Sequence, residues 1–557
     1  MTKTQNSSDQ QHLNVTLYHH EREKLGEAEL SFGGNRPTQV NFKISVPVAL
    51  TDGELVPLIK AVAENGKIYT LCKCKFYGLR LYADYLIESD IVVPEFDQIV
   101  VRYREVSEWF LHWQKIQGQI GEELTWGRKS KPLSVTVSTT EEQFTLSSEY
   151  IGYSERIGED LMIHEHVEFI FKTTGRKFNL PDLGEKTHEL SCLLSILIAY
   201  PATVMNVKVG LENGNFSQVH FLGYAHPERD VSDSGFSIKW FIQKPKIEDK
   251  WQTIFDHYYK SIYRNICWVR LAGMQRYEGF WEYKALGYVS LLDRYVTIQY
   301  GNSRKVEAGS VLPEKLREFR QEVTCVVPSL SKSDIDNIAK VADHIFASTQ
   351  PITFGYKYYA AIAKTDPDII KIISISKADF QFIKKIRDKI AHGDDPGLQD
   401  DDYSKVSNMI GKISLLLTYW AFLDFGLTTD DFVHCLSRPN NSLRVACILD
   451  EVHLARLSDT ANFFSVTAEK FDKLSKIGIR ISPCFVRESN GELSFSEYYT
   501  KMYKDWERNP SRSFGVLQPK EIFGVDNNTA KCFGHSYIES GEKRLEVFSM
   551  WVINLSQ

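Results

Sequence analysis

Apolar and polar residues alternate in short runs over roughly the first 240 positions of the chain. The runs are rich in Val, Ile, Phe, Tyr and Thr and are separated by turn residues, a pattern typical of β-strands. One longer stretch, residues 182–200, has the apolar spacing of a helix that ends before Pro201. We predict strands at residues 40–46, 66–72, 99–106, 165–171 and 217–222.

From about residue 247 the apolar residues recur every three or four positions, and this spacing indicates α-helices. Ile254, Tyr258 and Ile262, for example, would form one apolar stripe. Ser333 is followed three residues later by Asp336, which makes it a candidate cap at the start of a helix. We predict a run of about six helices, the later ones at residues 314–323, 333–347, 353–364, 377–391 and 403–425.

Beyond Pro439 the pattern is mixed, with a predicted strand at 443–449, a partly helical stretch at 461–477 and short strand-like runs within 506–557. The expected fold class is multidomain α+β, with no internal repeat. We expect four parts along the chain. They are a flexible tail (1–14), a β-rich N-terminal domain that senses or regulates (15–246), an all-α helical domain (247–438) and a small mixed α/β C-terminal region (439–557).

Length and composition narrow the class of protein. At ~100–200 residues per domain, 557 residues suggest about three domains, and the 43% hydrophobic content is ordinary for a packed chain. No apolar run approaches the ~20 residues of a membrane span, and the polar start does not resemble a signal peptide. Nine scattered cysteines fit the reducing cytoplasm, where we expect the protein. With a net charge of −6, any nucleic-acid binding must depend on local basic patches.

The predicted helix at 377–391 ends in a group of chemically competent residues, Arg387, Asp388 and His392, followed by Gly393 as the expected helix stop. At ~100° per residue, Asp388 and His392 lie on one side of this helix and Arg387 lies nearer its buried stripe. His is the natural acid or base near neutral pH, and Arg is a permanent forked cation for phosphate. These residue types suit cleavage of RNA without a metal or another cofactor.

Lys384, Lys385 and Lys389 would add local positive charge for an RNA backbone. The spacing alone is weak support, because an Arg followed five residues later by a His occurs often by chance. The alternative is a solvated helix end with a surface histidine.

The Arg-x4-His pattern with His-Gly at a helix end, inside an all-helical domain, resembles the HEPN superfamily (higher eukaryotes and prokaryotes nucleotide-binding). Its ribonuclease members carry Arg-x4–6-His, and Arg387, Asp388 and His392 match the Arg, the following polar residue and the His. The resemblance implies a HEPN-like helical domain and a metal-independent endoribonuclease. It also implies a homodimer or higher homo-oligomer, in which two motifs line one cleft.

Residues 66–74 and 96–110 resemble the N-terminal domain that is paired with HEPN in ApeA-type antiphage proteins, a likeness that covers about 15–435. The family implies abortive defence, in which a phage-derived trigger releases the cutting of cellular RNA, with tRNA as the expected target. The competing hypothesis is a non-catalytic RNA- or nucleotide-binding sensor module.

Three other groups were weighed against simpler explanations. His164, His166 and Glu168 alternate along a predicted strand and could bind a metal, or could form a polar strand surface. Asp293 could support the site as an acid, or could be a surface carboxylate paired with a nearby base. The tyrosines within 356–359 could stack bases, or could form a partly buried helix face.

Overall fold

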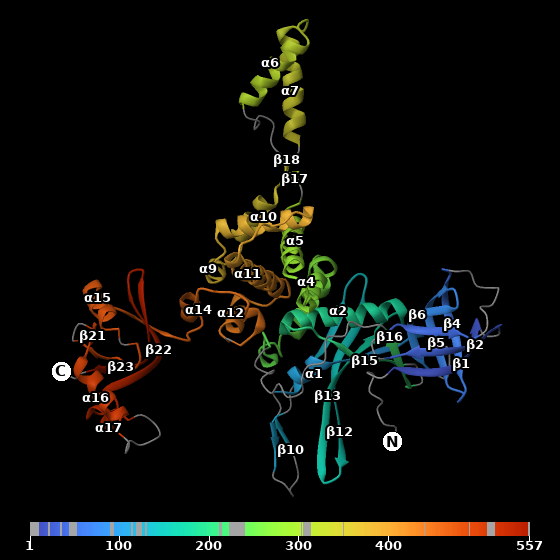
Figure 1. Cartoon of the computed structure of the whole chain (residues 1–557), viewed down its shortest axis with the longest axis horizontal. Helices are drawn as coiled ribbons and strands as arrows, with labels where there is room; N and C mark the ends of the chain where they lie inside the picture. Colours follow the sequence, from blue (N-terminus) through green and yellow to red (C-terminus); the bar gives the residue numbers. More distant parts are fainter. Residues whose placement is uncertain are drawn as a thin grey trace. The chain divides into compact units, whose positions relative to one another are not determined.

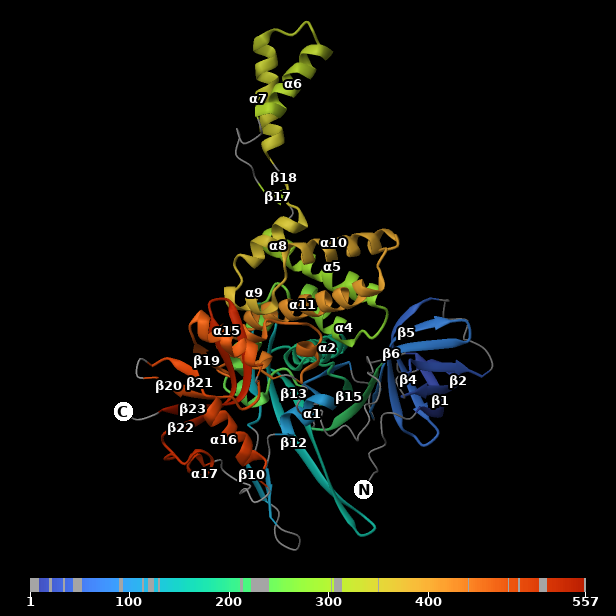
Figure 2. The same ribbon diagram turned by 60° about the vertical axis from the view of Figure 1, so that its left-hand side comes forward.

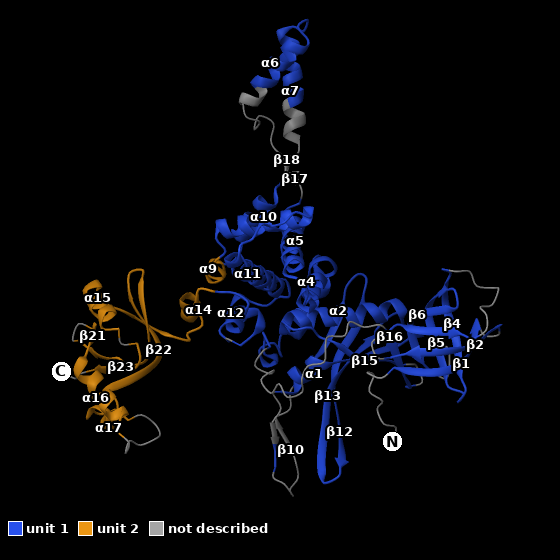
Figure 3. Cartoon of the chain, viewed as in Figure 1, with its two compact units in different colours: residues 1–366, 375–448 blue, residues 367–374, 449–557 orange. Residues whose placement is uncertain are grey.

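The chain folds into two compact units (Figure 3). Residues 1–366 with 375–448 form the first unit, and residues 367–374 with 449–557 form the second. The computed structural model describes residues 10–19, 23–33, 36–43, 53–89, 94–112, 115–118, 125–128, 131–210, 214–221, 240–301, 303–304, 313–348, 350–438, 440–478, 480–488, 491–509 and 518–554.

The first unit begins with a sheet of six strands that closes on itself. Its order is β6-β3-β2-β1-β4-β5, and β5 pairs again with β6. The inward residues, among them Leu17, Leu30 and Phe76, form one buried cluster. The closed sheet therefore has a core of its own. Its strands are β1 Gln11–His19, β2 Glu23–Phe32, β3 Thr38–Phe42, β4 Leu55–Ala63, β5 Ile68–Tyr77 and β6 Arg80–Glu88.

Strand β6 continues from the closed sheet into a second, open sheet. Its first half pairs with β3, and residues 85–87 pair with β16. The open sheet continues in the order β16-β15-β8-β13-β12-β11. Its strands are β16 Phe216–Phe221, β15 Val204–Gly210, β8 Gln98–Tyr103, β13 Asp160–Thr173, β12 Gln143–Ile157 and β11 Ser134–Ser138. Small strand pairs flank these sheets: β7 Glu95–Phe96 with β14 Phe178–Asn179, and β9 Lys115–Gln117 with β10 Thr125–Arg128.

Two helices pack with the open sheet. α1 Arg104–Leu111 follows β8 directly, so the predicted strand at 99–106 ends three residues early, at Tyr103. α2 Leu180–Ile198 confirms the predicted helix at 182–200 and begins with a capping box between Asn179 and Asp182. The strands predicted at 165–171 and 217–222 are confirmed by β13 and β16. The predicted strand at 40–46 ends at Phe42, and its residues 44–46 lie outside the described residues.

The helical part of the first unit surrounds one long buried helix, α11 Asp400–Asp424. α11 is the one described helix with the length and hydropathy of a membrane span, but 78% of its apolar window is buried inside the protein, as in a core helix. The β-rich N-terminal and helical parts confirm the predicted fold class. The other elements here are η2 Lys244–Lys246, α3 Trp251–Lys260, the π-helix η3 Arg264–Trp268, α4 Val269–Arg276, α5 Trp281–Tyr300, α8 Phe354–Ile362, α10 Lys377–His392, α12 Thr429–Leu436 and α13 Ser442–Val445.

A helical hairpin is inserted between α5 and α8 and projects from the helical part (Figures 1 and 2). It consists of α6 Pro313–Val326 and α7 Lys332–Ser348, above the short strands β17 Ser303–Arg304 and β18 Gln350–Pro351. The predicted cap at Ser333 is wrong. Ser331 caps α7 instead, because its hydroxyl accepts from the Asp334 backbone N–H and the Asp334 carboxylate accepts from the Ser331 N–H.

A buried ion network joins the β-rich part to the helical part. Lys186 of α2 contacts Glu142 at 2.7 Å and Glu189 at 3.0 Å. Arg264 of η3 reaches the same Glu142 at 3.0 Å. Lys186, Glu189 and Arg264 are all buried. Two cations thus balance two carboxylates at this junction, which is the arrangement that burial of charge requires.

The second unit is built on a five-stranded mixed sheet in the order β19-β22-β23-β20-β21. Helix α9, from the middle of the chain, packs here against α14: the Asp450 N–H donates to the carbonyl of Ile372, and His453 lies 2.9 Å from Asp368. The elements are α9 Pro367–Ile373, α14 Glu451–Leu457, β19 Asn462–Ser465, α15 Ala468–Ile477, β20 Cys484–Arg487, β21 Leu493–Phe495, α16 Glu497–Glu507, α17 Pro519–Phe523, β22 Ala530–Ser540 and β23 Lys543–Asn554.

The strand predicted at 443–449 is wrong, because Ser442–Val445 forms the short helix α13. The Asn441 side chain accepts from the Leu443 N–H and starts the helical turn. Val445 and Ile448 are exposed, so the apolar run is not a buried strand. Of the predicted tail (1–14), residues 1–9 lie outside the described residues, and residues 11–14 belong to β1. The other predicted boundaries stay predictions.

Candidate functional site

The candidate site lies on α10, whose two ends are fixed by local signals. The Ser376 side chain accepts from the Asp379 N–H and caps the first turn. Gly393 ends the helix in the left-handed conformation at φ 78°, and its N–H donates to the carbonyl of Ile390. The predicted stop at Gly393 is confirmed, and glycine suits it because a side chain would be strained there.

The buried face of α10 holds the helix against its neighbours. Ile383 and Ile386 are buried, whereas Ile390 is only half-buried. Phe380 completes the face and stacks on Tyr358 of α8, with ring centroids 3.8 Å apart. This packing fixes the side from which Arg387 projects.

Arg387 is held between two carboxylates. Its Nη2 donates to Oδ2 of Asp293, on α5, at 2.6 Å, and its Nη1 donates to Oδ1 of Asp388 at 2.8 Å. The Arg387 side chain is 20% exposed. Asp293 is thus the partner of the candidate catalytic arginine, which the sequence left as one of two alternatives.

The aromatic ring of Phe354, at the start of α8, lies under the guanidinium of Arg387 at 5.6 Å. The Nε of Arg387 is enclosed and has no hydrogen-bond partner among the described residues. Nothing in the spacing of the sequence connects Phe354 with Arg387, because the two meet only when α8 and α10 pack together. The guanidinium is therefore fixed in direction by Asp293, Asp388 and Phe354.

His392 is the last residue of α10 and is exposed. Its ring makes no hydrogen bond or ion pair with any residue that the structure describes. Asp388 lies one turn earlier on the same side of the helix, and Arg387 lies about 7.5 Å back along the axis at 1.5 Å per residue. The ring is therefore accessible to a substrate, about one and a half turns along the helix from the fixed Arg387.

The three lysines predicted to bind RNA have different surroundings. Lys384 pairs with Asp388 at 3.1 Å. Lys389 donates to the carbonyls of Asp395 and Pro396, both at 3.1 Å, and so holds the loop after the helix. Lys385 is exposed and has no ion-pair partner in the described part of the chain. Of the three, Lys385 is the cation that is most accessible to a phosphate.

The electrostatics of the site favour the ionised form of Asp388. Burial acts to raise the pKa of Asp388, but hydrogen bonds from Lys384 and Arg387 outweigh burial, and the pKa is lowered below its usual value. Asp388 therefore stays a carboxylate and keeps its contact with Arg387 near neutral pH. The arrangement offers a positioned cation, a fixed carboxylate and an accessible imidazole, which are the groups needed for proton transfer at a phosphodiester.

The alternating histidines of β13 form a polar strand surface rather than a metal centre. His166 lies 3.5 Å from Glu168, Glu168 pairs with Lys208 at 2.8 Å, and His164 faces Glu155. Within the described ranges, no group of three or more His, Cys, Asp or Glu side chains is placed to hold a metal ion. In the aromatic group, Tyr358 is buried against Phe380 while Tyr356 is exposed, so these tyrosines form a partly buried helix face.

Comparisons with protein families match two segments of the chain. A family model described as ApeA N-terminal domain 1 matches residues 9–258, and one described as Apea-like HEPN matches residues 286–431. The matched segments include the closed and open sheets of the first unit and the whole of α10. Comparison with curated proteins and with solved structures finds no match.

Residues 286–431 are therefore a HEPN domain, and Arg387, Asp388 and His392 lie inside it. Because the ApeA N-terminal domain precedes this HEPN domain, the chain belongs to the ApeA-type HEPN proteins. Membership of this family indicates a nuclease of antiphage defence. The second unit lies almost entirely outside both matches, and only its segment 367–374 falls within the HEPN match.

Proposed function

We propose that this protein is a metal-independent endoribonuclease that acts in the cytoplasm in abortive antiphage defence. It cuts cellular RNA, with tRNA as the expected target, when a phage-derived trigger releases it. The observation that carries the proposal is the Arg387–Asp293–Asp388 contact set, which fixes one cation on the helix that ends at the exposed His392.

In the proposed reaction the 2′-oxygen of a ribose attacks the adjacent phosphorus and the 5′-oxygen of the next nucleotide leaves. Arg387 binds a non-bridging phosphoryl oxygen and stabilises the charge that builds there. His392 takes the proton from the 2′-hydroxyl or gives one to the leaving oxygen. Asp388 orients Arg387. The products carry a 2′,3′-cyclic phosphate and a 5′-hydroxyl.

One His392 cannot act as base and acid in the same step, so the proposal includes a homodimer or higher oligomer of HEPN domains. In a composite cleft, His392 of one protomer would act as the base and the partner's His392 as the acid. Lys385 supplies an accessible positive charge for the RNA backbone, and Lys384 and Lys389 add to the local field.

The test is incubation of the purified full-length protein with total bacterial RNA and EDTA, with cut positions read by end sequencing. We expect discrete cuts by the wild type, cyclic-phosphate ends, and a loss of about 10²–10³-fold or more in the His392→Ala variant. His257→Ala is the matched control, because His257 is an exposed histidine on another helix of the same unit.

If the purified protein makes no cuts, the same assay is repeated with a lysate of infected cells, which supplies the trigger. Cuts that survive both Arg387→Ala and His392→Ala would overturn the proposed site. RNA binding without cutting under either condition would instead favour the non-catalytic binding module.

A further inference from the structure

A pocket of about 470 Å³ lies in the first unit between the two sheets, α2 and the end of α4. Lys73 of β5 and Tyr85 of β6 line it from the closed sheet, Phe221 of β16 from the open sheet, and Arg276 from α4. One face of α2, within residues 184–191, forms another wall. The volume lies within the ~300–1,000 Å³ range of small-molecule sites. The pocket is separate from the candidate nuclease site, whose residues do not line it.

The pocket is elongated along α2. Tyr85 approaches this helix at Gly184, where a Cβ atom would come within 2.5 Å of the tyrosine hydroxyl. Arg276 approaches the same helix at Ser191, whose Oγ accepts a hydrogen bond from Nη2 of the guanidinium. At 1.5 Å per residue, these two points are about 10 Å apart along the helix axis. A ligand that fills the pocket therefore reaches from the closed sheet to the end of α4.

Aromatic rings line the pocket from its closed-sheet end. The rings of Tyr85 and Phe221, which are paired across β6 and β16, lie with their centroids 5.7 Å apart and their planes tilted by 45°. Both side chains are half-buried, so part of each ring is accessible to a ligand. Ala202, whose carbonyl accepts from Arg276, lines the pocket at its other end. Rings in such a position typically bury the apolar body of a small ligand.

The Arg276 end of the pocket suits a carboxylate. Nη2 of Arg276 donates to Oγ of Ser191 and, at 3.3 Å, to the carbonyl of Ala202, both of which are uncharged oxygens. These bonds position the guanidinium, whose planar fork matches a carboxylate. His188 lies one turn before Ser191 on α2 and also lines the pocket. Burial, together with the charge of Arg276, lowers the pKa of His188, so its imidazole is neutral near pH 7.

The charges of the pocket favour a ligand with a single negative charge. Among the lining residues that the structure describes, Lys73 and Arg276 are the two cations at neutral pH and Glu185 is the one acid, which leaves one net positive charge. One carboxylate balances this charge. A polyanion such as a di- or triphosphate would leave excess negative charge near Glu185, at a cost in binding free energy.

Lys73 has a strained backbone at the closed-sheet end of the pocket. Its φ is 53°, in the left-handed region, and the pairing of β5 with both β4 and β6 skips it. Its ammonium lies 5.7 Å from the centroid of the Tyr85 ring and makes no ion pair with any residue that the structure describes. Glycine would adopt this φ without strain. Strain of this kind is typically retained at ligand-binding positions.

We propose that this pocket binds an elongated organic monoanion, with its carboxylate at Arg276 and His188 and an aromatic body against Tyr85 and Phe221. Such a ligand bridges the closed sheet and α4, which ends shortly before the segment matched by the HEPN family. Binding at this pocket does not rest on the proposed nuclease function, because no residue of the nuclease site takes part in it.

The test is titration of the full-length protein at pH 7 with 4-phenylbutyrate and with 4-phenylbutyramide, followed by ligand-observed NMR. The two probes have the same shape, but only the first carries a charge. We expect 4-phenylbutyrate to bind with a Kd of about 1–10 mM, the range for a ligand of this size. The amide should bind about fivefold more weakly or worse, because it makes no charge-assisted hydrogen bond.

Two variants separate the contribution of charge from that of the rings. Arg276→Gln should weaken 4-phenylbutyrate about 5- to 50-fold and leave the amide unchanged, because only the carboxylate pairs with the guanidinium. Phe221→Ala should weaken both probes by the same factor, about 3- to 10-fold, because the apolar body of each loses its contact. The unfolding temperature of each variant is measured to verify folding, and Arg276→Lys, which keeps the charge without the fork, should recover part of the loss.

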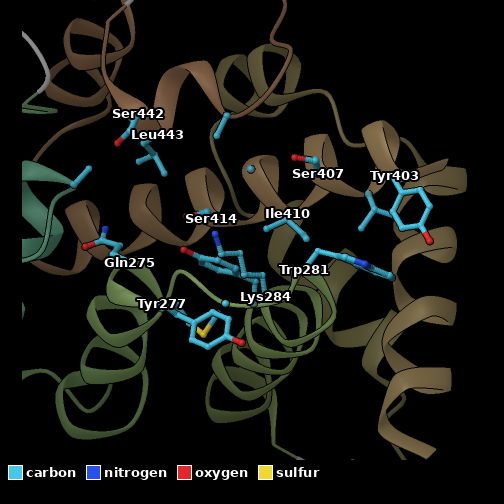
Figure 4. Close-up of a pocket in the computed structure, with 17 residues that line it drawn as sticks. Gln275, Tyr277, Trp281, Lys284, Tyr403, Ser407, Ile410, Ser414, Ser442 and Leu443 are labelled. Atoms are coloured by element: carbon cyan, nitrogen blue, oxygen red, sulfur yellow. The ribbon is translucent and has the colours of Figure 1, made fainter. Parts of the chain in front are cut away.

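A second pocket of the same unit supplies the control. It lies between α4–α5 and α11–α13, and Trp281 and Lys284 line it (Figure 4). Because it also offers an aromatic ring and a cation, it is the competing site for an aromatic carboxylate. Trp281→Ala and Lys284→Ala should leave the binding of 4-phenylbutyrate unchanged.

Lys73→Gly tests whether the strained lysine belongs to the site. The substitution should leave the unfolding temperature unchanged or raise it, because glycine relieves the backbone strain. It should weaken 4-phenylbutyrate about two- to fivefold, because one of the two cations is lost. A lower unfolding temperature with unchanged binding would contradict the assignment of Lys73 to the site.

The inference is overturned if neither probe binds or if the carboxylate and the amide bind equally well. It is also overturned if the variants of the second pocket weaken 4-phenylbutyrate as much as Arg276→Gln does. Absence of RNA cutting in a protein that binds the probe as expected would count against the proposed function alone.

Discussion

The guanidinium of Arg387 donates hydrogen bonds to two carboxylates, and these bonds limit how it can bind a phosphate. Two strong hydrogen bonds occupy its terminal nitrogens, so an incoming phosphate has to use the remaining donors or displace one carboxylate. Fixing the guanidinium in advance reduces the entropy lost when a phosphate binds. Asp293 acts through Arg387 and is therefore a positioning residue.

Asp293→Asn should lower kcat for RNA cutting about tenfold while changing KM little, because a misdirected guanidinium still attracts RNA. Asp293→Glu should recover part of the loss. The measurement is initial cutting rate against RNA concentration, under conditions in which the wild type cuts. Asp336→Asn breaks a comparable acid–arginine pair with Arg320 outside the site and should leave both constants unchanged. A rise in KM alone would contradict the positioning role.

At the scale of helices and strands, the sequence pattern predicts most of the features that local interactions determine, such as the position and the end of a helix. Helical spacing predicts α10 to within a residue, and Gly393 predicts its end. The pattern fails where two local signals compete, as at α7, whose cap is Ser331 rather than Ser333. It also cannot reveal partners that meet only in the folded chain. For that reason Phe354, and the pairing of Asp293 with Arg387, required the structure.

Ser331→Ala should destabilise the first turns of α7 by about 1 kcal/mol, because the Asp334 N–H loses its acceptor. Ser333→Ala is the matched control and should leave the helix unchanged or slightly more stable, since Ala favours a helix interior. The measurement is hydrogen exchange of the amides of residues 332–342 in the full chain. Equal acceleration of exchange in the two variants would contradict the assignment of the cap.

At the scale of the whole molecule, the β-rich and helical parts of the first unit are held together by charge as well as by apolar packing. Glu142 and Glu189 come from the segment matched by the ApeA N-terminal domain, and Arg264 lies between the two matched segments. Burial raises the pKa of Glu189, although Lys186 and Arg264 act to lower it. The network therefore links the proposed sensor to the start of the helical part, through the buried Arg264 of η3.

Lys186→Met should lower the temperature of the first unfolding transition by roughly 5–10 °C at pH 7, because it leaves Glu142 and Glu189 with Arg264 as their one remaining partner in the network. The raised pKa of Glu189 means that the folded state takes up a proton before the unfolded state does as the pH falls. Stability is therefore lost as the pH rises through that pKa. The unfolding temperature of Lys186→Met should accordingly lie closer to that of the wild type at pH 5 than at pH 7.

Lys131→Met serves as the control for this variant, because the Lys131–Asp249 pair is exposed and such pairs contribute little. Thermal unfolding at both pH values is followed by scanning calorimetry. If Lys186→Met lowers the unfolding temperature equally at both pH values, Glu189 is not the group that the loss of Lys186 destabilises.

The chain crosses between its two units at 366–367, 374–375 and 448–449. Helix α9 therefore has its buried residues Ile369, Ile372 and Ile373 in the second unit, while its sequence neighbours on both sides belong to the HEPN domain. Removing everything after residue 448 would leave these isoleucines exposed in the middle of the HEPN segment. In evolutionary terms, the C-terminal unit is not a module that a lineage could gain or discard by one fusion or one stop codon. Gain or loss of this unit would have to be matched by changes at these isoleucines inside the HEPN segment.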